Sequence, residues 1–98
     1  MIEIVIQKSH NPKKKYDAII NGSKTVSFGA AGYEDYTTHH DEKRKQNYKR
    51  HSNEDWSRSN LESAGWMSRY ILWEKPTLQE AIKHANGMYR DVKFKYKV

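Results

Sequence analysis

Histidine and carboxylate side chains gather near the middle of the sequence, where their types could bind a metal ion. His39 and His40 precede Asp41, and His51 follows further along. Imidazole and carboxylate groups are good ligands for transition metals. A helix over residues 41–51 would, however, separate His40 from His51 by about 16 Å along its axis, too far to share one ion. We therefore expect no metal site, and interpret these groups as polar residues near the two ends of a helix.

Other catalytic constellations are not evident in the sequence. A hairpin followed by a histidine-containing helix is the arrangement of small metal-dependent nucleases of the ββα type, but the later ligands of that pattern are missing. Paired carboxylates, a Ser-His-Asp arrangement and a phosphate-cradling glycine loop do not stand out. Gly29 and Gly32 give only a weak spacing, typical of a chain that leaves a sheet. No enzymatic activity and no cofactor are expected.

Lysine, arginine and tyrosine side chains offer a clearer chemistry, that of a contact surface. Lysines neutralise phosphates and tyrosine rings stack on bases, while tyrosine and arginine are also favoured at protein–protein interfaces. The sequence alone does not separate these two kinds of partner. The candidate contact residues are Lys13, Lys14, Lys15, Lys24, Tyr33, Tyr36, Lys43, Arg44, Tyr48, Lys49 and Arg50.

Length and composition limit what can position these residues. The chain has 98 residues, a formal net charge of +6 and no cysteine. We expect a single domain over residues 1–98, with polyanionic partners favoured by the charge. The lack of cysteine excludes disulfides, cysteine zinc sites and thiol catalysis. Neither a signal-peptide segment nor a run of about 20 apolar residues is present, so we expect no membrane span and no secretion.

Two segments in the first third of the chain are typical of a β-hairpin. Residues 16–20 and 24–28 flank Asn21 and Gly22, which both tolerate the positive φ of a type I′ turn. Ser23 leaves the loop length open. Apolar and polar side chains also alternate over residues 2–7 and 92–98, which predicts a strand near each end of the chain.

A basic helix is predicted over residues 41–51, with Thr37 or Thr38 as its N-cap. Acidic residues lie at its start and basic residues toward its end, as the helix dipole prefers. The helix has almost no aliphatic stripe, so we expect it to lean on the fold through Tyr48 and through the stems of its long side chains.

Two further helices are predicted in the second half. A core helix covers residues 64–73, with Ser63 or Asn60 as its cap and Trp66 among its apolar face. The next helix begins at a capping box of Thr77 and Glu80 and stops near residues 86–87. Together these elements predict an α+β fold, a small antiparallel sheet built from the hairpin and the terminal strands and covered by two or three short helices.

One long stretch of the chain carries a family resemblance. It reads KYDAIINGSKTVSFGAAGYEDYTTHHDEKRKQNYKRHSNEDW, followed later by AGWMSRYILWEKPTLQEAIK. It resembles an uncharacterised family of short basic proteins encoded by large double-stranded DNA viruses and some phages, over about residues 15–83. The run SFGAAGYEDYT is the most distinctive part, with Arg44, Tyr48, Arg50, His51 and Trp56 downstream. The resemblance implies a viral setting and brings no activity, so no catalytic residue is carried over.

The first functional hypothesis is a non-enzymatic viral protein, a minor virion or assembly component that docks on other proteins through its basic and aromatic surface. The alternative is a nucleic-acid-binding accessory protein that acts in the infected cell. A host-defence antagonist and a metal-dependent nuclease rank below these two. The expected location is the virion or the interior of the host cell, in the cytoplasm or the nucleus.

Overall fold

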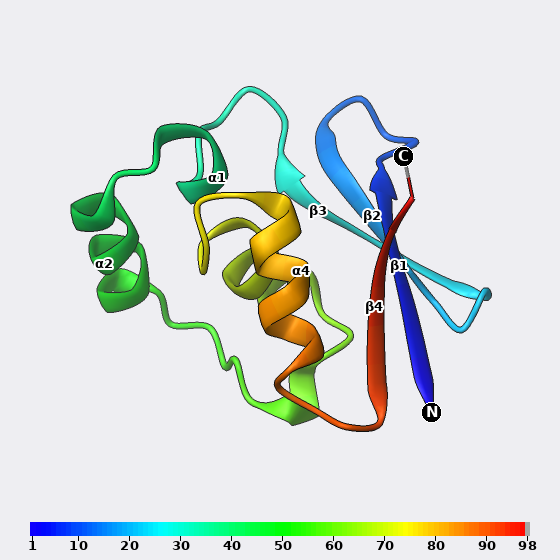
Figure 1. The fold of residues 1–98 in the computed structure, drawn as a ribbon. Coiled ribbons are helices and arrows are strands. Elements are labelled where there is room, and N and C mark those ends of the chain that lie inside the picture. The colour runs from blue at the N-terminus through cyan, green and yellow to red at the C-terminus, as the bar shows by residue number, and fades with distance from the viewer. Residues whose placement is uncertain (98) are drawn as a thin grey trace.

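Four strands form one sheet in the order β3-β2-β1-β4 in a computed structural model, which describes residues 1–97 (Figure 1). The strands are β1 (Ile2–Lys8), β2 (Lys14–Ile20), β3 (Lys24–Ala30) and β4 (Val92–Lys97). β1 pairs antiparallel with β2, and β2 with β3, whereas β4 runs parallel to β1. The predicted α+β class is confirmed, and the mixed sheet corrects the prediction of antiparallel pairing throughout. Val98, the last residue predicted for the C-terminal strand, lies outside the described residues.

The parallel pairing of β4 follows from the path of the chain. After β3 the chain leaves one edge of the sheet, forms the helices, and returns at the opposite edge, where Val92 is the partner of Ile2. Parallel neighbours need such a long crossover, whereas antiparallel neighbours can be joined by a tight turn.

The hairpin between β2 and β3 turns at the predicted residues. Asn21 and Gly22 have φ of 50° and 72°, and the Ser23 amide donates to the Ile20 carbonyl over 3.1 Å. Two consecutive residues in the left-handed region are the mark of a type I′ turn, whose twist matches that of the strands. The predicted hairpin is confirmed.

The residues between β3 and β4 form a helical layer on one face of the sheet (Figure 1). There are more helical segments than the two or three predicted. They are α1 (Tyr36–His39), α2 (Glu42–His51), the 3-10 turn η1 (Arg58–Asn60), α3 (Ala64–Met67), the π-helical turn η2 (Ser68–Leu72) and α4 (Leu78–Asn86).

The start of α2 differs from the prediction. Its N-cap is Asp41, whose carboxylate accepts from the amides of Lys43 and Arg44 at 3.0 and 3.3 Å. His40, with a φ of 56°, separates α2 from α1. Thr37 and Thr38, predicted as N-caps of this helix, lie instead in α1. The Asp41 carboxylate is favoured as the N-cap because it accepts hydrogen bonds from two backbone amides at once.

The core lies between the sheet and the segment formed by α3 and η2. Trp66 is fully buried and stacks on Phe94 of β4, with ring centroids 5.7 Å apart and planes within 7°. Met67, Ile71 and Leu72 are also buried. The predicted core helix is therefore present, capped by Ser63, although its second half is π-helical.

Helix α4 begins and ends where predicted and is tied to β4. The Thr77 hydroxyl accepts from the Glu80 amide, and Gly87 follows the last helical residue. The side-chain amide of Asn86 donates to the Phe94 carbonyl and accepts from the Phe94 amide, at 3.0 and 2.7 Å. This amide occupies the position that a further strand would take, so it closes part of the edge of β4.

Candidate functional site

Helix α2 stands farthest from the sheet and buries none of its side chains (Figure 1). Tyr48 holds it in place. The Tyr48 ring lies parallel to Trp73 at a centroid distance of 4.3 Å, and it stacks on Trp56 at 5.8 Å. Lys45 adds a hydrogen bond of 2.8 Å from its Nζ to the Glu74 carbonyl. The Tyr48 stack and Lys45 thus hold the helix against the rest of the fold, which leaves Lys43, Lys49 and Arg50 available.

Four of the candidate contact residues on α2 remain accessible. Lys43, Arg44 and Arg50 are exposed and Lys49 is half-buried. Within residues 1–97, no carboxylate lies within ion-pair distance of Lys43, Lys49 or Arg50, and Arg44 pairs with exposed Glu34 at 3.4 Å. Unpaired cations on a rigid helix form a surface that is ready to meet negative charge.

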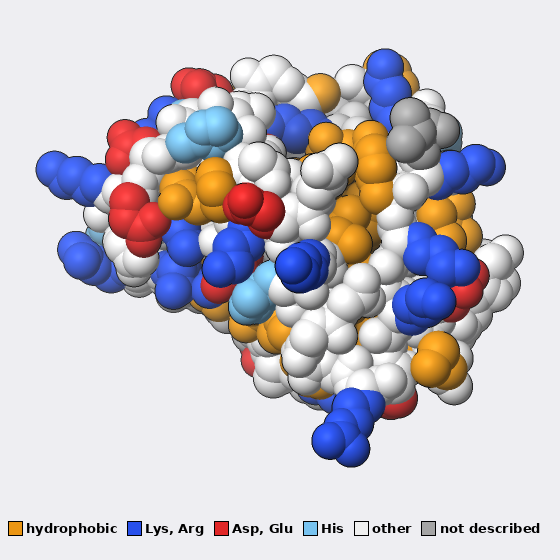
Figure 2. Space-filling model, in the orientation of Figure 1, with side chains coloured by type: hydrophobic (Ala, Val, Ile, Leu, Met, Phe, Trp, Pro, Cys, Tyr) orange, Lys and Arg blue, Asp and Glu red, His pale blue; other side chains and the backbone are white. Residues whose placement is uncertain are grey.

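A second group of candidate residues lies at the start of β2 and on the two loops nearest to α1. Lys13 and Lys14 are exposed, and Tyr33 is 74% exposed. The Lys13 carbonyl accepts from the Ala31 amide over 2.9 Å, which joins the β1–β2 loop to the β3–α1 loop. The β3–α1 loop then reaches α2 through the Glu34–Arg44 pair. These contacts connect the two groups of exposed candidates. Figure 2 shows Lys and Arg side chains scattered over the face of the molecule that it draws.

Of the remaining candidates, Lys15, Tyr36 and Tyr48 make contacts within the fold, whereas Lys24 is exposed but lies apart from both groups. Lys15 is largely buried and its Nζ lies 2.5 Å from the Asp35 carboxylate. Lys24 lies at the hairpin tip, at the other end of the sheet, beside Glu62. The Tyr36 hydroxyl donates to Glu42 over 2.9 Å, and this hydrogen bond raises the pKa of Tyr36. Tyr48, as described, lies inside the aromatic stack. Fewer of the candidate residues are therefore available for contact than the sequence predicts.

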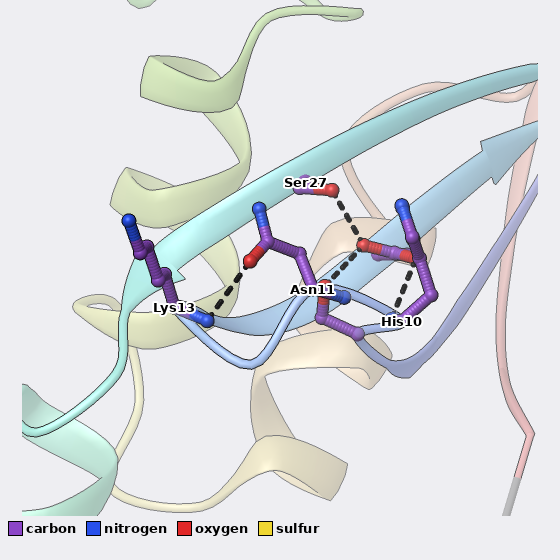
Figure 3. Close-up of polar contacts among 6 residues, drawn as sticks. His10, Asn11, Lys13 and Ser27 are labelled. Atoms are coloured by element: carbon purple, nitrogen blue, oxygen red, sulfur yellow. Dashed lines mark hydrogen bonds and ion pairs between the residues drawn. The ribbon is translucent and has the colours of Figure 1, made fainter.

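The best-defined polar cluster was not found from the sequence. Asp17 of β2 is 1% exposed, on the sheet face opposite the helices. Its carboxylate accepts from the hydroxyls of Ser9 and Ser27 at 2.6 and 2.7 Å, and from the amide and Nδ1 of His10 at 3.2 and 2.5 Å (Figure 3). Aspartate is disfavoured inside strands, so its position in KKYDAII was the available signal.

Ionisation of Asp17 is favoured by this environment. Burial is the largest influence and opposes the charged form, but the hydrogen bonds from Ser9, His10 and Ser27 together outweigh it. The pKa of Asp17 therefore lies well below its usual range. The carboxylate holds the β1–β2 loop against the sheet, while His10, whose side chain is 73% exposed, remains at the surface.

The histidines considered as metal ligands contribute to local structure. The His39 ring packs on Trp73 at 5.3 Å, and its Nδ1 accepts from the Asp41 amide. His40 is the C-cap of α1, and its Nε2 lies 3.2 Å from the Thr37 carbonyl oxygen. Across residues 1–97, no three His, Asp or Glu side chains converge as a metal ion would require.

Taken together, the fold and its surface define a small α+β domain whose basic helix stands away from its core. A family model described as a family of unknown function (DUF5754) matches residues 4–51, which run from β1 to the end of α2. No curated protein and no solved structure matches the chain significantly. Over the part of the chain described, no helix has both the length and the apolar character needed to cross a bilayer.

Proposed function

We propose that this protein is a non-catalytic docking module that binds an acidic surface on another protein, as a minor component of a viral particle or of its assembly. The observation that carries the proposal is the state of α2. This helix contributes nothing to the core, yet the Tyr48 stack holds it rigidly, and Lys43, Lys49 and Arg50 lie on it without ion-pair partners in residues 1–97.

The contacts that the tyrosines already make within the fold favour a protein partner over stacked nucleic-acid bases. Single-stranded nucleic acid is commonly bound by rings on which bases stack. Tyr48 is already stacked on Trp56 and Trp73, and Tyr36 is half-buried and donates a hydrogen bond to Glu42. Tyr33 remains exposed beside the basic loop, and tyrosine with arginine is a combination typical of protein interfaces. The viral setting is supported by the resemblance of the SFGAAGYEDYT stretch.

Lysine-reactive cross-linking of purified particles, followed by mass spectrometry, tests this proposal. Lys43 and Lys49 are expected to cross-link to acidic segments of another particle protein. Absence of the chain from the particles would contradict the proposal, as would cross-links restricted to Lys83 and Lys93, which lie on other elements.

A pair of charge-reversal variants separates the α2 surface from net charge. The test variant carries Lys43→Glu and Arg50→Glu, and the control carries Lys83→Glu and Arg90→Glu. All four side chains are exposed, and none is ion-paired within residues 1–97. The test variant should lose incorporation into particles while the control keeps it. Equal loss in both would show that overall charge, and not α2, is responsible.

A second candidate function is binding to the backbone of double-stranded nucleic acid. The observation that favours it is the row of lysines on the open face of β4, where Lys93 and Lys97 are exposed and Lys95 pairs with Glu3 at 3.4 Å. Each phosphate contact contributes about −0.9 to the slope of log affinity against log salt. Lys93→Ala and Lys97→Ala should each make that slope less steep by about 0.9, the contribution of one phosphate contact. An unchanged slope would exclude β4 as the surface that contacts the phosphates.

A further inference from the structure

A hollow of about 560 Å³ opens at the end of the sheet where β1 and β4 finish and β2 begins. Its walls include Tyr16 of β2 and Tyr96 of β4, together with α1 and the β1–β2 loop. Tyr16 and Tyr96 are on the face of the sheet that bears the core. Tyr96 is level with Ile6 of β1, and Tyr16 lies one step beyond Ala18 along β2, opposite buried Phe28. Both rings line the hollow, where Tyr16 is half-buried and Tyr96 is exposed.

The two tyrosines offer both a ring and hydroxyl donors. Their centroids are 6.4 Å apart and their planes meet at 75°, so the rings form a corner. Tyr96 is 41% exposed. In Figure 2 a hydrophobic patch lies between the helical layer and the upper part of β1 and β4, with Lys and Arg side chains near it. Burial raises the pKa of Tyr16, with smaller contributions from Tyr96 and Asp35, so its hydroxyl stays protonated at neutral pH.

Positive charge dominates the rim and the base of the hollow. Lys8 and Lys14 are exposed and have no ion-pair partner in residues 1–97, and Lys15 lies deeper. Asp35 is the acidic residue of the lining, and its carboxylate is already engaged. It accepts from Lys15 Nζ and from the Thr37 hydroxyl, both at 2.5 Å, and from the Thr37 amide at 2.9 Å. Asp35 thus fixes Lys15 and leaves two lysines to meet an anion.

We propose that this hollow binds a 5′-mononucleotide unit, with its phosphate at Lys8 and Lys14 and its base against the Tyr96 ring. Lysines bind phosphate as point charges, and a tyrosine face accepts a flat ring. A volume of about 560 Å³ is within the range of small-ligand sites, which is roughly 300 to 1,000 Å³. The same chemistry occurs in a free nucleotide and at the 5′-phosphorylated end of a strand.

Titration of the full chain with AMP, followed by backbone NMR, tests the proposal. Resonances around Tyr16, Tyr96 and the β1–β2 loop should shift, while those of α2 should not. Inorganic phosphate and adenosine, each lacking one half of the ligand, should bind at least tenfold more weakly than AMP. The absence of shifts in the hollow at about 10 mM AMP would overturn the proposal, since that concentration would detect even millimolar affinity.

Variants assign the two halves of the ligand. Lys8→Ala with Lys14→Ala should weaken AMP binding at least tenfold, whereas the control pair Lys83→Ala and Arg90→Ala should bind as the wild type does. Tyr96→Leu, which retains apolar bulk, should remove the preference for AMP over ribose 5-phosphate. Unchanged affinity in the first pair, or an unchanged preference in the Tyr96 variant, would refute the assignment. All are exposed positions, and each variant's amide spectrum checks its fold.

Two further arms identify the source of the nucleotide and keep this inference separate from the docking proposal. A short oligonucleotide is titrated with and without a 5′-phosphate. Binding that needs the phosphate and matches AMP assigns a strand end, and weaker binding than AMP assigns a free nucleotide. The α2 variant Lys43→Glu with Arg50→Glu should bind AMP normally, so loss of docking and loss of nucleotide binding are distinguishable.

Discussion

Replacement of Asp17 by alanine is expected to destabilise the protein strongly, although the residue belongs neither to the core nor to the exposed basic surface. The substitution removes an acceptor that is 1% exposed and serves four donors. Ser9 and His10 lose the group that fixes their loop, and Ser27 is left beneath that loop without its partner.

The size of the effect follows from the partners. A hydrogen bond to a charged group is worth about 1.5 to 3 kcal/mol, and such values do not add fully within one cluster. Exposed His10 regains water when released, whereas Ser27, half-buried beneath the loop, regains less. We expect a loss of about 3 kcal/mol in the free energy of unfolding, close to the low end of what breaking a buried charge pair costs. In a domain of this size that corresponds to a fall in Tm of about 12 to 24 °C.

Chemical and thermal unfolding followed by circular dichroism measure this loss, with two comparison variants. Asp17→Asn keeps the shape and one acceptor oxygen, so it should lose about half as much. His10→Ala removes only the solvent-exposed partner and should cost about 1 kcal/mol. The expected order of stability is wild type, His10→Ala, Asp17→Asn and Asp17→Ala. A loss below about 1 kcal/mol for Asp17→Ala would refute the reasoning, because the buried acceptor would then be dispensable.

The same cluster predicts a specific dependence of stability on pH. The pKa of Asp17 is lower in the folded state than in the unfolded chain, where it is about 3.9. Its contribution is therefore complete above about pH 4 to 5 and is lost as the pH falls toward the folded-state pKa. The difference in unfolding free energy between wild type and Asp17→Asn should shrink over this acid range, by at most about 1.4 kcal/mol per pH unit. A constant difference down to about pH 2 would contradict the assignment of the lowered pKa.

Three other substitutions test the fold at separate places. Gly29→Ala should lower the free energy of unfolding by about 2 to 3 kcal/mol, since the residue has a φ of 77° and its added Cβ would lie 2.8 Å from Leu72 Cδ1. Gly32→Ala, at a φ of 87° but with open space around the added Cβ, should lower it by about 1 kcal/mol. Equal Tm shifts in the two variants would contradict the packing argument. Tyr48→Ala should abolish amide protection in α2 while the sheet keeps its own, measured by hydrogen exchange. Asn86→Ala should lower the free energy of unfolding, measured with denaturant, by about 2 kcal/mol, because two backbone groups of β4 lose their hydrogen-bond partner. An unchanged free energy would show that water replaces the side-chain amide.

The local sequence pattern predicted most of the helices and strands, but it did not predict how the strands pair. The Asn21-Gly22 turn and the Thr77 cap depend on neighbours within a few residues, so their patterns are readable directly. The direction of β4 is different. Apolar alternation is identical in parallel and antiparallel strands, so residues 92–97 carry no sign of which one applies. His40 likewise separates α1 from α2 in a left-handed conformation, which is uncommon outside glycine and is not indicated by the residue type.

The candidate surface was only partly predictable for a related reason. Residue type identifies which side chains can contact a polyanion, but exposure depends on partners far along the chain. Lys15 is occupied by Asp35, twenty residues away, and Tyr48 is enclosed by Trp73. Lys43 and Arg50 meet no such partner within residues 1–97 and stay accessible. Sequence reasoning therefore located the basic helix, and its candidate residues included several that the fold itself uses.

Two buried carboxylates explain how so few contacts hold the accessible lysines in position. Asp17 fixes the β1–β2 loop from the open face of the sheet, and Asp35 fixes Lys15 and α1 from the helical side. The exposed Lys14 lies between these two attachments, one residue before Lys15. A lysine on a free loop would lose conformational entropy on meeting an anion, whereas Lys14, at the start of a strand held from both sides, has already lost part of it. For the proposed binding of an anion at Lys14, the buried acids would thus lower the entropic cost, although neither is exposed enough to touch a ligand itself.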